Sequence, residues 1–284
     1  MVHVSVNLLN DEQGINRYCL SITPVHKGRE PSLIEDNSYD YKLSSSLSRT
    51  RTSAIAYALC NDFTHFCTFT FDPKLISDRT NYSEVKNKLT KFFNNYRNRV
   101  SPDFRYIVIP ELHEDGQSIH FHGLCKGIVD FEVPDTIFKR SIPRDINSPM
   151  IEVPNTKGYT RWKSYKYGFF DCSPINSKLA ISNYISAYVT KDLCSKFPKN
   201  SKILLKSNDL RKPTQLYSFD AIYDADFKKV SIDFKDLYSL AYTKGTGVFV
   251  KQYEYATCFY IEDMRNGENV GIEIAEEIIN NYLN

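Results

Sequence analysis

The segment PELHEDGQSIHFHGL, residues 110–124, is the part of the sequence that most constrains the fold. Its Asp115-Gly116 pair is favoured in two-residue β-hairpin turns, and apolar and polar residues alternate beyond it. If this pair forms the centre of the turn, Glu111 lies directly across from His120 on the neighbouring strand. The segment therefore predicts a hairpin with one polar face and one apolar face.

The polar face of this hairpin gathers candidate metal ligands. His122 follows two residues after His120, so the Glu111 carboxylate and two imidazoles share one face. This donor set suits Mg²⁺, Mn²⁺ or a related divalent ion with open positions for substrate. The alternative is a half-exposed hairpin with incidental histidines, but three of the six histidines of the chain lie in this segment. His113 shares the face nearer the turn, as a fourth ligand or a bystander.

The segments around the hairpin predict an α+β fold. A β-branched and aromatic run at 64–73 predicts a strand, and strands are also expected at 104–112 and 118–127. Helices are expected at 82–100, where apolar residues recur at helical spacing, and at 177–196, which has no internal glycine or proline. The order strand, helix, strand, strand, helix is typical of an antiparallel sheet with helices packed on it.

The flanking regions carry fewer signals. Residues 128–160 contain four prolines and predict an irregular excursion, and a short helix is expected through AIAYALCNDF before the first strand. Residues 200–284 mix strand-like pieces, KKVSIDF, TGVFVKQYEY and ATCFYIE, with a helix from about Ile272 to Tyr282. The core elements are therefore expected between residues 64 and 196.

The composition is that of an ordinary globular protein. The 284 residues are 42% hydrophobic and 25% charged, enough to bury one substantial core with room for a second small subdomain. No apolar run approaches the roughly 20 residues needed to cross a bilayer, and the N-terminus lacks a signal-peptide pattern. Seven scattered cysteines without Cys-x-x-Cys spacing favour reduced thiols. We therefore expect a cytoplasmic protein with no membrane partner.

The predicted helix 177–196 carries two tyrosines and a lysine in one stripe. Tyr184, Tyr188 and Lys191 stand at positions i, i+4 and i+7, beside an apolar stripe that should face the core. The simplest alternative is that both tyrosines widen the buried stripe. A phenol can, however, attack a phosphodiester when a metal ion orients the phosphate and withdraws its charge, and a nearby ammonium group assists that attack.

A second candidate nucleic-acid feature is the run KGYTRWKSYKYGFF, residues 157–170. The net charge of the chain is only +2, but this run combines cations with aromatic rings. Cations that follow phosphates and rings that stack on bases are typical of single-strand binding. The candidate contacts are Lys157, Arg161, Trp162, Lys163, Tyr165 and Lys166. A solvated loop with a few anchoring aromatic residues explains the run equally well.

Three motifs together resemble the HUH endonucleases, the replication initiators and relaxases that nick single-stranded DNA. HFH within SIHFHGL resembles their His-hydrophobic-His motif, and FCTFTFDP resembles the first motif of the replication-initiator branch. YISAYVTK resembles the paired-tyrosine helix found in initiators of small single-stranded DNA phages and in some plasmid and prophage proteins. The motifs occur in the family's order and cover about residues 64–195.

The resemblance implies a fold and a metal site. The fold is an α+β one with a central five-stranded antiparallel sheet and flanking helices. The cofactor is a divalent metal, Mg²⁺ or Mn²⁺, held by His120 and His122, with Glu111 as the expected third ligand. His113 competes with Glu111 for that third place.

The resemblance also implies a 5′-phosphotyrosine intermediate. Tyr188 ranks first as nucleophile because Lys191, the assisting lysine, follows it by three residues; Tyr184 is the second candidate. The expected domains are an N-terminal extension (1–50), the nuclease domain (51–198) and a C-terminal extension (199–284) packed on the nuclease domain.

The function implied is site-specific nicking and joining of single-stranded DNA at a replication origin, which initiates rolling-circle replication of a phage, prophage or plasmid in a bacterial host. No G-x-x-x-x-G-K-[ST] motif is present, so a host helicase and polymerase are the expected partners. The alternatives are a two-tyrosine transposase or conjugative relaxase with the same chemistry, or a non-catalytic single-strand-binding protein.

Overall fold

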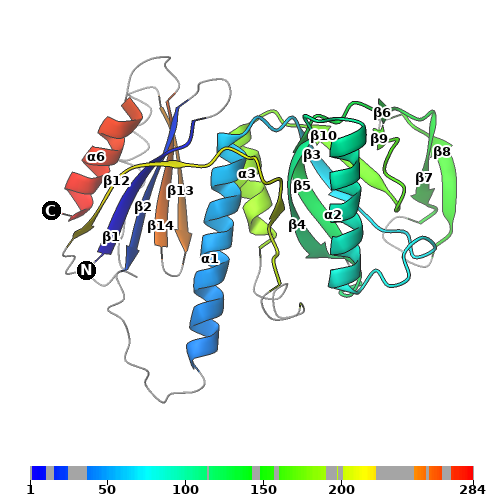
Figure 1. Cartoon of the computed structure of the whole chain (residues 1–284), viewed down its shortest axis with the longest axis horizontal. Coiled ribbons are helices and arrows are strands. Elements are labelled where there is room, and N and C mark those ends of the chain that lie inside the picture. Colours follow the sequence, from blue (N-terminus) through cyan, green and yellow to red (C-terminus); the bar gives the residue numbers. More distant parts are fainter. Residues whose placement is uncertain are drawn as a thin grey trace. The chain divides into compact units, whose positions relative to one another are not determined.

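The structure is a computed structural model in which the described residues form two compact units (Figure 1). They are residues 2–10, 16–24, 37–113, 115–142, 148–156, 160–189, 197, 201–221, 246–253, 256–263 and 270–283. Unit one groups Met1–Asp62, Lys178–Asp192 and Asn208–Asn284, and unit two groups Phe63–Ser177 and Leu193–Ser207. Among the described residues, no helix has both the length and the apolar character needed to cross a bilayer.

Unit two is built on the predicted five-stranded antiparallel sheet. The strand order is β10-β3-β5-β4-β11, and every neighbouring pair is antiparallel. The strands are β3 (His65–Phe69), β4 (Arg105–Leu112), β5 (Ile119–Lys126), β10 (Phe170–Pro174) and β11 (Leu205–Lys206). The predicted strands at 64–73, 104–112 and 118–127 are therefore confirmed as β3, β4 and β5, and the predicted α+β fold with them.

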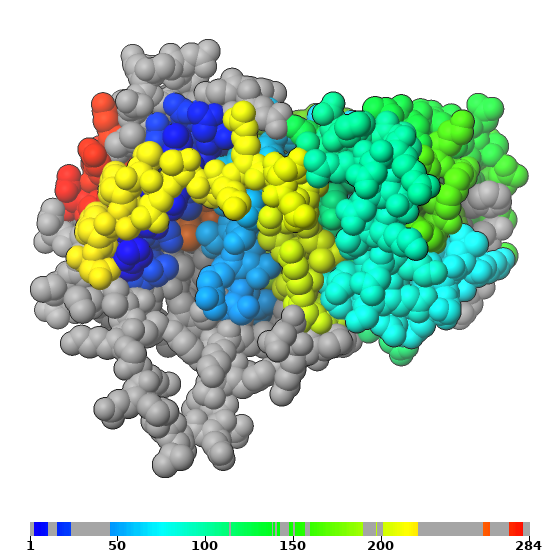
Figure 2. All heavy atoms as spheres, in the orientation of Figure 1, coloured from blue at the N-terminus to red at the C-terminus, as the bar shows by residue number. Residues whose placement is uncertain are grey.

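Helix α2 (Tyr82–Arg99) covers one face of this sheet. It begins where the Asn81 side chain accepts a hydrogen bond from the Glu84 backbone N–H, as helix N-caps do. Its apolar residues are buried as the helical spacing predicts: Val85, Leu89, Phe92, Phe93 and Tyr96. Phe93 packs edge-on against Phe69 of β3, with ring centroids 5.2 Å apart. In Figure 2, α2 spreads in teal over the visible face of unit two.

The predicted irregular excursion at 128–160 is wrong in part, because the segment forms short β pairs. Strand β6 (Phe131–Glu132) pairs with β9 (Arg161–Trp162), and β7 (Thr136–Arg140) pairs with β8 (Met150–Pro154). The prolines do not prevent this, because Pro134 precedes β7 and Pro154 ends β8. Both pairs lie beyond strand β10, at the outer edge of unit two (Figure 1).

Unit one contains a second five-stranded antiparallel sheet that the sequence did not predict as a unit. Its order is β12-β1-β2-β14-β13. The strands are β1 (Val2–Leu8), β2 (Arg17–Pro24), β12 (Thr214–Ala221), β13 (Thr246–Tyr253) and β14 (Ala256–Asp263). The compact units thus cut across the linear extensions 1–50 and 199–284, because strands from both ends of the chain pair in one sheet.

Helices cover both faces of this second sheet. Helix α6 (Val270–Leu283) packs on one apolar face, and α1 (Asn37–Cys60) packs on the other (Figure 1). Helix α1 is longer than the short helix expected through AIAYALCNDF, whereas TGVFVKQYEY and ATCFYIE form β13 and β14 as expected. The segment KKVSIDF lies outside the described residues.

The third helix of unit one, α3 (Lys178–Ala187), lies beside α1. Two polar contacts hold the end regions together: Lys178 forms an ion pair with Asp62, and the Arg51 guanidinium donates a hydrogen bond to the Val189 carbonyl over 2.8 Å. The predicted helix 177–196 is therefore shorter among the described residues, and residues 190–196 lie outside them.

Candidate functional site

The hairpin register predicted from the sequence is confirmed. Glu111 on β4 pairs with His120 on β5, and Leu112 pairs with Ile119. The two-residue turn itself is wrong: the His113 carbonyl accepts from the Gly116 N–H over 2.8 Å, and the His113 N–H donates to the Ser118 carbonyl over 2.7 Å. The longer loop has the same centre as the expected turn, so the partner of each ligand residue is unchanged.

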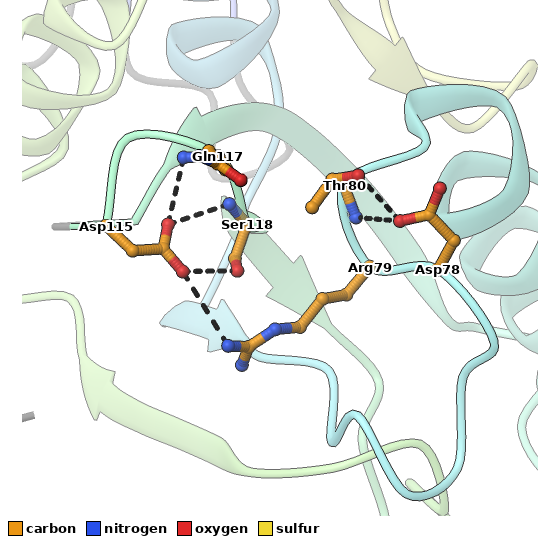
Figure 3. Close-up of polar contacts among 6 residues, drawn as sticks. All are labelled: Asp78, Arg79, Thr80, Asp115, Gln117 and Ser118. Carbon is orange, nitrogen blue, oxygen red and sulfur yellow. Dashed lines mark hydrogen bonds and ion pairs between the residues drawn. The ribbon is translucent and has the colours of Figure 1, made fainter. Parts of the chain in front are cut away.

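Asp115 holds this loop in place (Figure 3). One of its carboxylate oxygens accepts hydrogen bonds from the backbone N–H groups of Gln117 and Ser118, and the other accepts from the Ser118 hydroxyl. Arg79 approaches the same carboxylate to 3.6 Å. Burial alone would raise the pKa of Asp115, but these hydrogen bonds outweigh it and lower the pKa to about 2. Gly116 adopts a φ of 67°, which a side chain would disfavour.

Glu111, His120 and His122 converge on the sheet face opposite α2. Glu111 Oε2 lies 2.8 Å from His120 Nε2 and 2.7 Å from His122 Nε2. The three ligand atoms all lie within 4.8 Å of one another. Burial alone would raise the pKa of Glu111, but the hydrogen bonds from both imidazoles lower it to about 2. One ionised carboxylate and two ring nitrogens fit a divalent cation.

A further layer of contacts orients His122. Its Nδ1 lies 3.1 Å from the hydroxyl of Thr68, its direct pairing partner on β3. The ring of Phe66 stacks on the imidazole, with centroids 5.7 Å apart and an angle of 9° between the planes. Hydrogen bonds of this kind fix the tautomer and orientation of a metal-binding histidine. The sequence interpretation missed Thr68; its position in FCTFTFDP was the available signal.

His113 is placed apart from this cluster. Its ring centroid lies 5.5 Å from that of His120, but no ligand atom of His113 belongs to the group that converges around Glu111. Of the two candidates for the third ligand, the geometry therefore supports Glu111. A metal-binding role for any of these residues remains a prediction.

The two candidate nucleophiles, which belong to unit one, lie together at the end of α3. Tyr188 follows the last helical residue in a turn, and its hydroxyl donates a hydrogen bond to the Tyr184 hydroxyl over 2.6 Å. Tyr184 is 52% exposed, whereas Ile185 and Val189 are buried, which fits the predicted border position of the tyrosines. Lys191 lies outside the described residues.

Residues 64–193 match the model of a family described as the ORF2 type of replication-associated protein. This segment is a replication-associated protein domain. The matched range contains the metal-ligand candidates on β4 and β5, both tyrosines and Lys191, so the predicted relation to rolling-circle replication proteins is confirmed. Searches of curated proteins and of solved structures found no match to the chain.

Within the replication-associated domain, the predicted DNA-contact run divides into buried and exposed parts. Trp162 and Tyr165 are buried in the aromatic core beside Phe92, so they do not offer the open stacking faces that the sequence suggested. The indole N–H of Trp162 donates to Asp130 over 2.9 Å. The exposed cations are Arg161, Lys163 and Lys166, whereas Lys157 lies outside the described residues. Binding of DNA by these cations stays a prediction.

Proposed function

We propose that this protein is a metal-dependent, site-specific endonuclease that nicks and rejoins single-stranded DNA and thereby initiates rolling-circle replication of a phage, prophage or plasmid. The observation that carries the proposal is the convergence of Glu111, His120 and His122 within a replication-associated domain. A binding protein without catalytic activity has no need for this donor set on one sheet face.

The three side chains would hold Mg²⁺ or Mn²⁺. The ion, when bound, would neutralise phosphate charge and orient the scissile phosphodiester for in-line attack. Glu111 supplies an anionic ligand at neutral pH because its pKa is held at about 2. Thr68 would keep the His122 ring aimed at the ion through Nδ1.

The nucleophile in this proposal is a tyrosine hydroxyl, with Tyr188 ranked before Tyr184. The phenol oxygen forms a bond to phosphorus as the bond from phosphorus to the 3′ oxygen breaks. The phenol gives up its proton, and the departing oxygen gains one to become a 3′-hydroxyl. One phosphodiester linkage is exchanged for another, so the strand can be rejoined without ATP. Lys191 would stabilise the negative charge that develops.

The cellular setting follows from this chemistry as part of the proposal. The free 3′-hydroxyl primes synthesis, while a host helicase and polymerase act at the single-stranded origin in the cytoplasm of a bacterial cell. The second tyrosine would attack in a later joining step, for which a neighbouring hydroxyl is the simplest provision.

The test is a search for a covalent protein–DNA adduct. Single-stranded oligonucleotides from the genomic neighbourhood of the gene are incubated with the protein and Mn²⁺ or EDTA, then separated on a denaturing gel. We expect a metal-dependent adduct that survives Tyr184→Phe and disappears in Tyr188→Phe. Tyr57→Phe, a change to a partly buried tyrosine of α1, is the control.

The other outcomes separate the alternatives. Loss of the adduct in Tyr184→Phe alone would exchange the roles of the two tyrosines. Cleavage without an adduct would indicate a metal-activated water instead of a tyrosine. Absence of cleavage on every DNA, with salt-dependent binding retained, would leave a single-strand-binding protein.

A further inference from the structure

A cavity of about 560 Å³ lies in unit two between the edge strand β10 and the short β pairs beyond it. Its lining includes Lys139 of β7, Thr160, Arg161 of β9, and Phe169 and Asp171 on the β10 side. This volume lies within the roughly 300–1,000 Å³ typical of small-molecule sites. The β pairs that close it belong to the segment 128–160, which the family resemblance did not explain.

The groups around the cavity suit a nucleotide. Phe169 is 55% exposed and can present a ring to a base, over a floor that includes buried Trp162. Lys139 and Arg161 are exposed cations; the Arg161 guanidinium lies 3.5 Å from Glu132, in a solvent-exposed ion pair that a phosphate could replace at low cost. Apolar walls, cations at the rim and one carboxylate are the groups that a base and its phosphate require.

The sheet register connects this cavity to the candidate metal centre. Asp171 pairs with Thr68, and Thr68 pairs with His122, so the three residues form one row across β10, β3 and β5. Directly paired residues point to the same face, and two strand spacings correspond to about 10 Å. A strand bound at the metal centre therefore reaches the cavity within its next few nucleotides.

We propose that this cavity binds one base of the single-stranded DNA substrate, with Phe169 stacking on the base, Lys139 and Arg161 contacting phosphate, and Asp171 accepting a hydrogen bond from an exocyclic amino group. The proposal rests on the proposed function for its substrate class. It adds a site for sequence recognition beside the site of chemistry. An ionised carboxylate only accepts hydrogen bonds, so cytosine, with its N4 amino group, is favoured over thymine.

The environment of Asp171 fits this role. Partial desolvation raises the pKa of its carboxyl, as expected of a group that lines a cavity. A base that enters the cavity would cover the carboxylate and exclude competing water. The hydrogen bond would then contribute more to discrimination between bases than one on an open surface.

The test measures binding without cleavage. Fluorescein-labelled dC12 and dT12 are titrated with the protein in EDTA, and fluorescence anisotropy gives Kd at one fixed salt concentration. We expect dC12 to bind at least about fivefold more tightly than dT12, and Asp171→Ala to abolish this ratio. Phe169→Ala should weaken binding of both strands by about tenfold. Phe219→Ala, at an exposed phenylalanine of unit one, should leave both Kd values unchanged.

The result that would overturn the proposal is equal binding of dC12 and dT12, or a ratio unaffected by Asp171→Ala. Circular dichroism of each variant separates loss of binding from loss of folding. The adduct assay distinguishes the two proposals: an adduct that forms while the cavity variants bind normally would reject the base site alone. Base-selective binding without any adduct would reject the nuclease and keep the base site.

Discussion

The β4–β5 hairpin and the end of helix α3 carry the two halves of the proposed chemistry, and they are built differently. In the hairpin, cross-strand pairing and two hydrogen bonds to one carboxylate oxygen hold the ligand candidates. At the end of α3, the tyrosines lie one turn apart, and their hydroxyl groups share a hydrogen bond in an exposed setting. The hairpin is a preorganised site, whereas the tyrosine pair is carried on the end of a single helix.

This difference suggests a division of labour. A metal centre needs its ligands fixed in advance, because misplaced donors lose affinity for the ion. A nucleophile that acts in turn with its neighbour benefits from a looser mounting on an exposed helix end. Substitutions in the hairpin should therefore change metal affinity or stability, whereas substitutions of the tyrosine hydroxyls should change only the covalent chemistry.

The largest expected effect is loss of metal binding on removal of a hairpin ligand. His122→Ala should lower the affinity for Mn²⁺ by more than about 100-fold, because a direct ligand matters more than the contacts that orient it. Isothermal titration calorimetry of the metal-free protein measures this. His113→Ala is the matched control and should change the affinity by less than about twofold. Equal losses in both variants would make His113 a ligand.

A stability change should follow from crowding of the hairpin at Gly123. A Cβ atom added there would overlap the Val108 side chain and the Ile107 carbonyl oxygen on the neighbouring strand. Gly123→Ala should therefore lower the free energy of unfolding by about 1–3 kcal/mol or more. Urea unfolding checks this, with the exposed β10 change Ser173→Ala as control. An unchanged midpoint would show that the strands can separate here without cost.

Thr68 should matter through His122 rather than through packing. Thr68→Val keeps the shape but loses the hydroxyl near Nδ1, so the affinity for Mn²⁺ should fall by about tenfold. Thr68→Ser keeps the hydroxyl and should restore most of the affinity in the same titration. If valine and serine bind Mn²⁺ equally well, the hydroxyl does not orient the ring.

The loop of the hairpin should respond to acid through Asp115. Its pKa of about 2 in the folded protein lies below the value of about 3.9 in an unfolded chain. The ionised carboxylate therefore stabilises the fold above about pH 4, and this contribution is lost as the pH falls toward 2. Solvent screening limits it to about 1 kcal/mol. The stability difference between wild type and Asp115→Asn in urea should shrink from pH 6 to pH 3; a difference that stays constant would exclude the carboxylate charge as its cause.

The smallest expected effect is at the end of α3. The double variant Tyr184→Phe, Tyr188→Phe should change the free energy of unfolding by no more than about 0.5 kcal/mol, because the hydrogen bond that it removes joins two hydroxyls in an exposed setting. Its affinity for Mn²⁺ should equal that of the wild type. A clear drop in thermal stability would mean that the tyrosine pair is structural, and would remove the contrast with the hairpin.

The sequence by itself determined the parts of this protein that depend on neighbouring residues. The alternation around Asp115 and Gly116 predicted that Glu111 pairs with His120, because hairpin register is a local property. The buried face of α2 and the one-turn spacing of the tyrosines also followed from the helical period. The turn was predicted with the wrong length, but its centre was right, so the ligand set survived.

Only the tertiary structure decided what depends on residues far apart in the chain. It paired Thr68 with His122, buried Trp162 among the aromatic residues of α2, and joined β1 and β2 to β14 in a second sheet. It also turned the segment 128–160 into short β pairs beside a cavity. The physical reason is that these contacts are selected by competition among many distant partners for the same core, and no local pattern in the sequence records which partner wins.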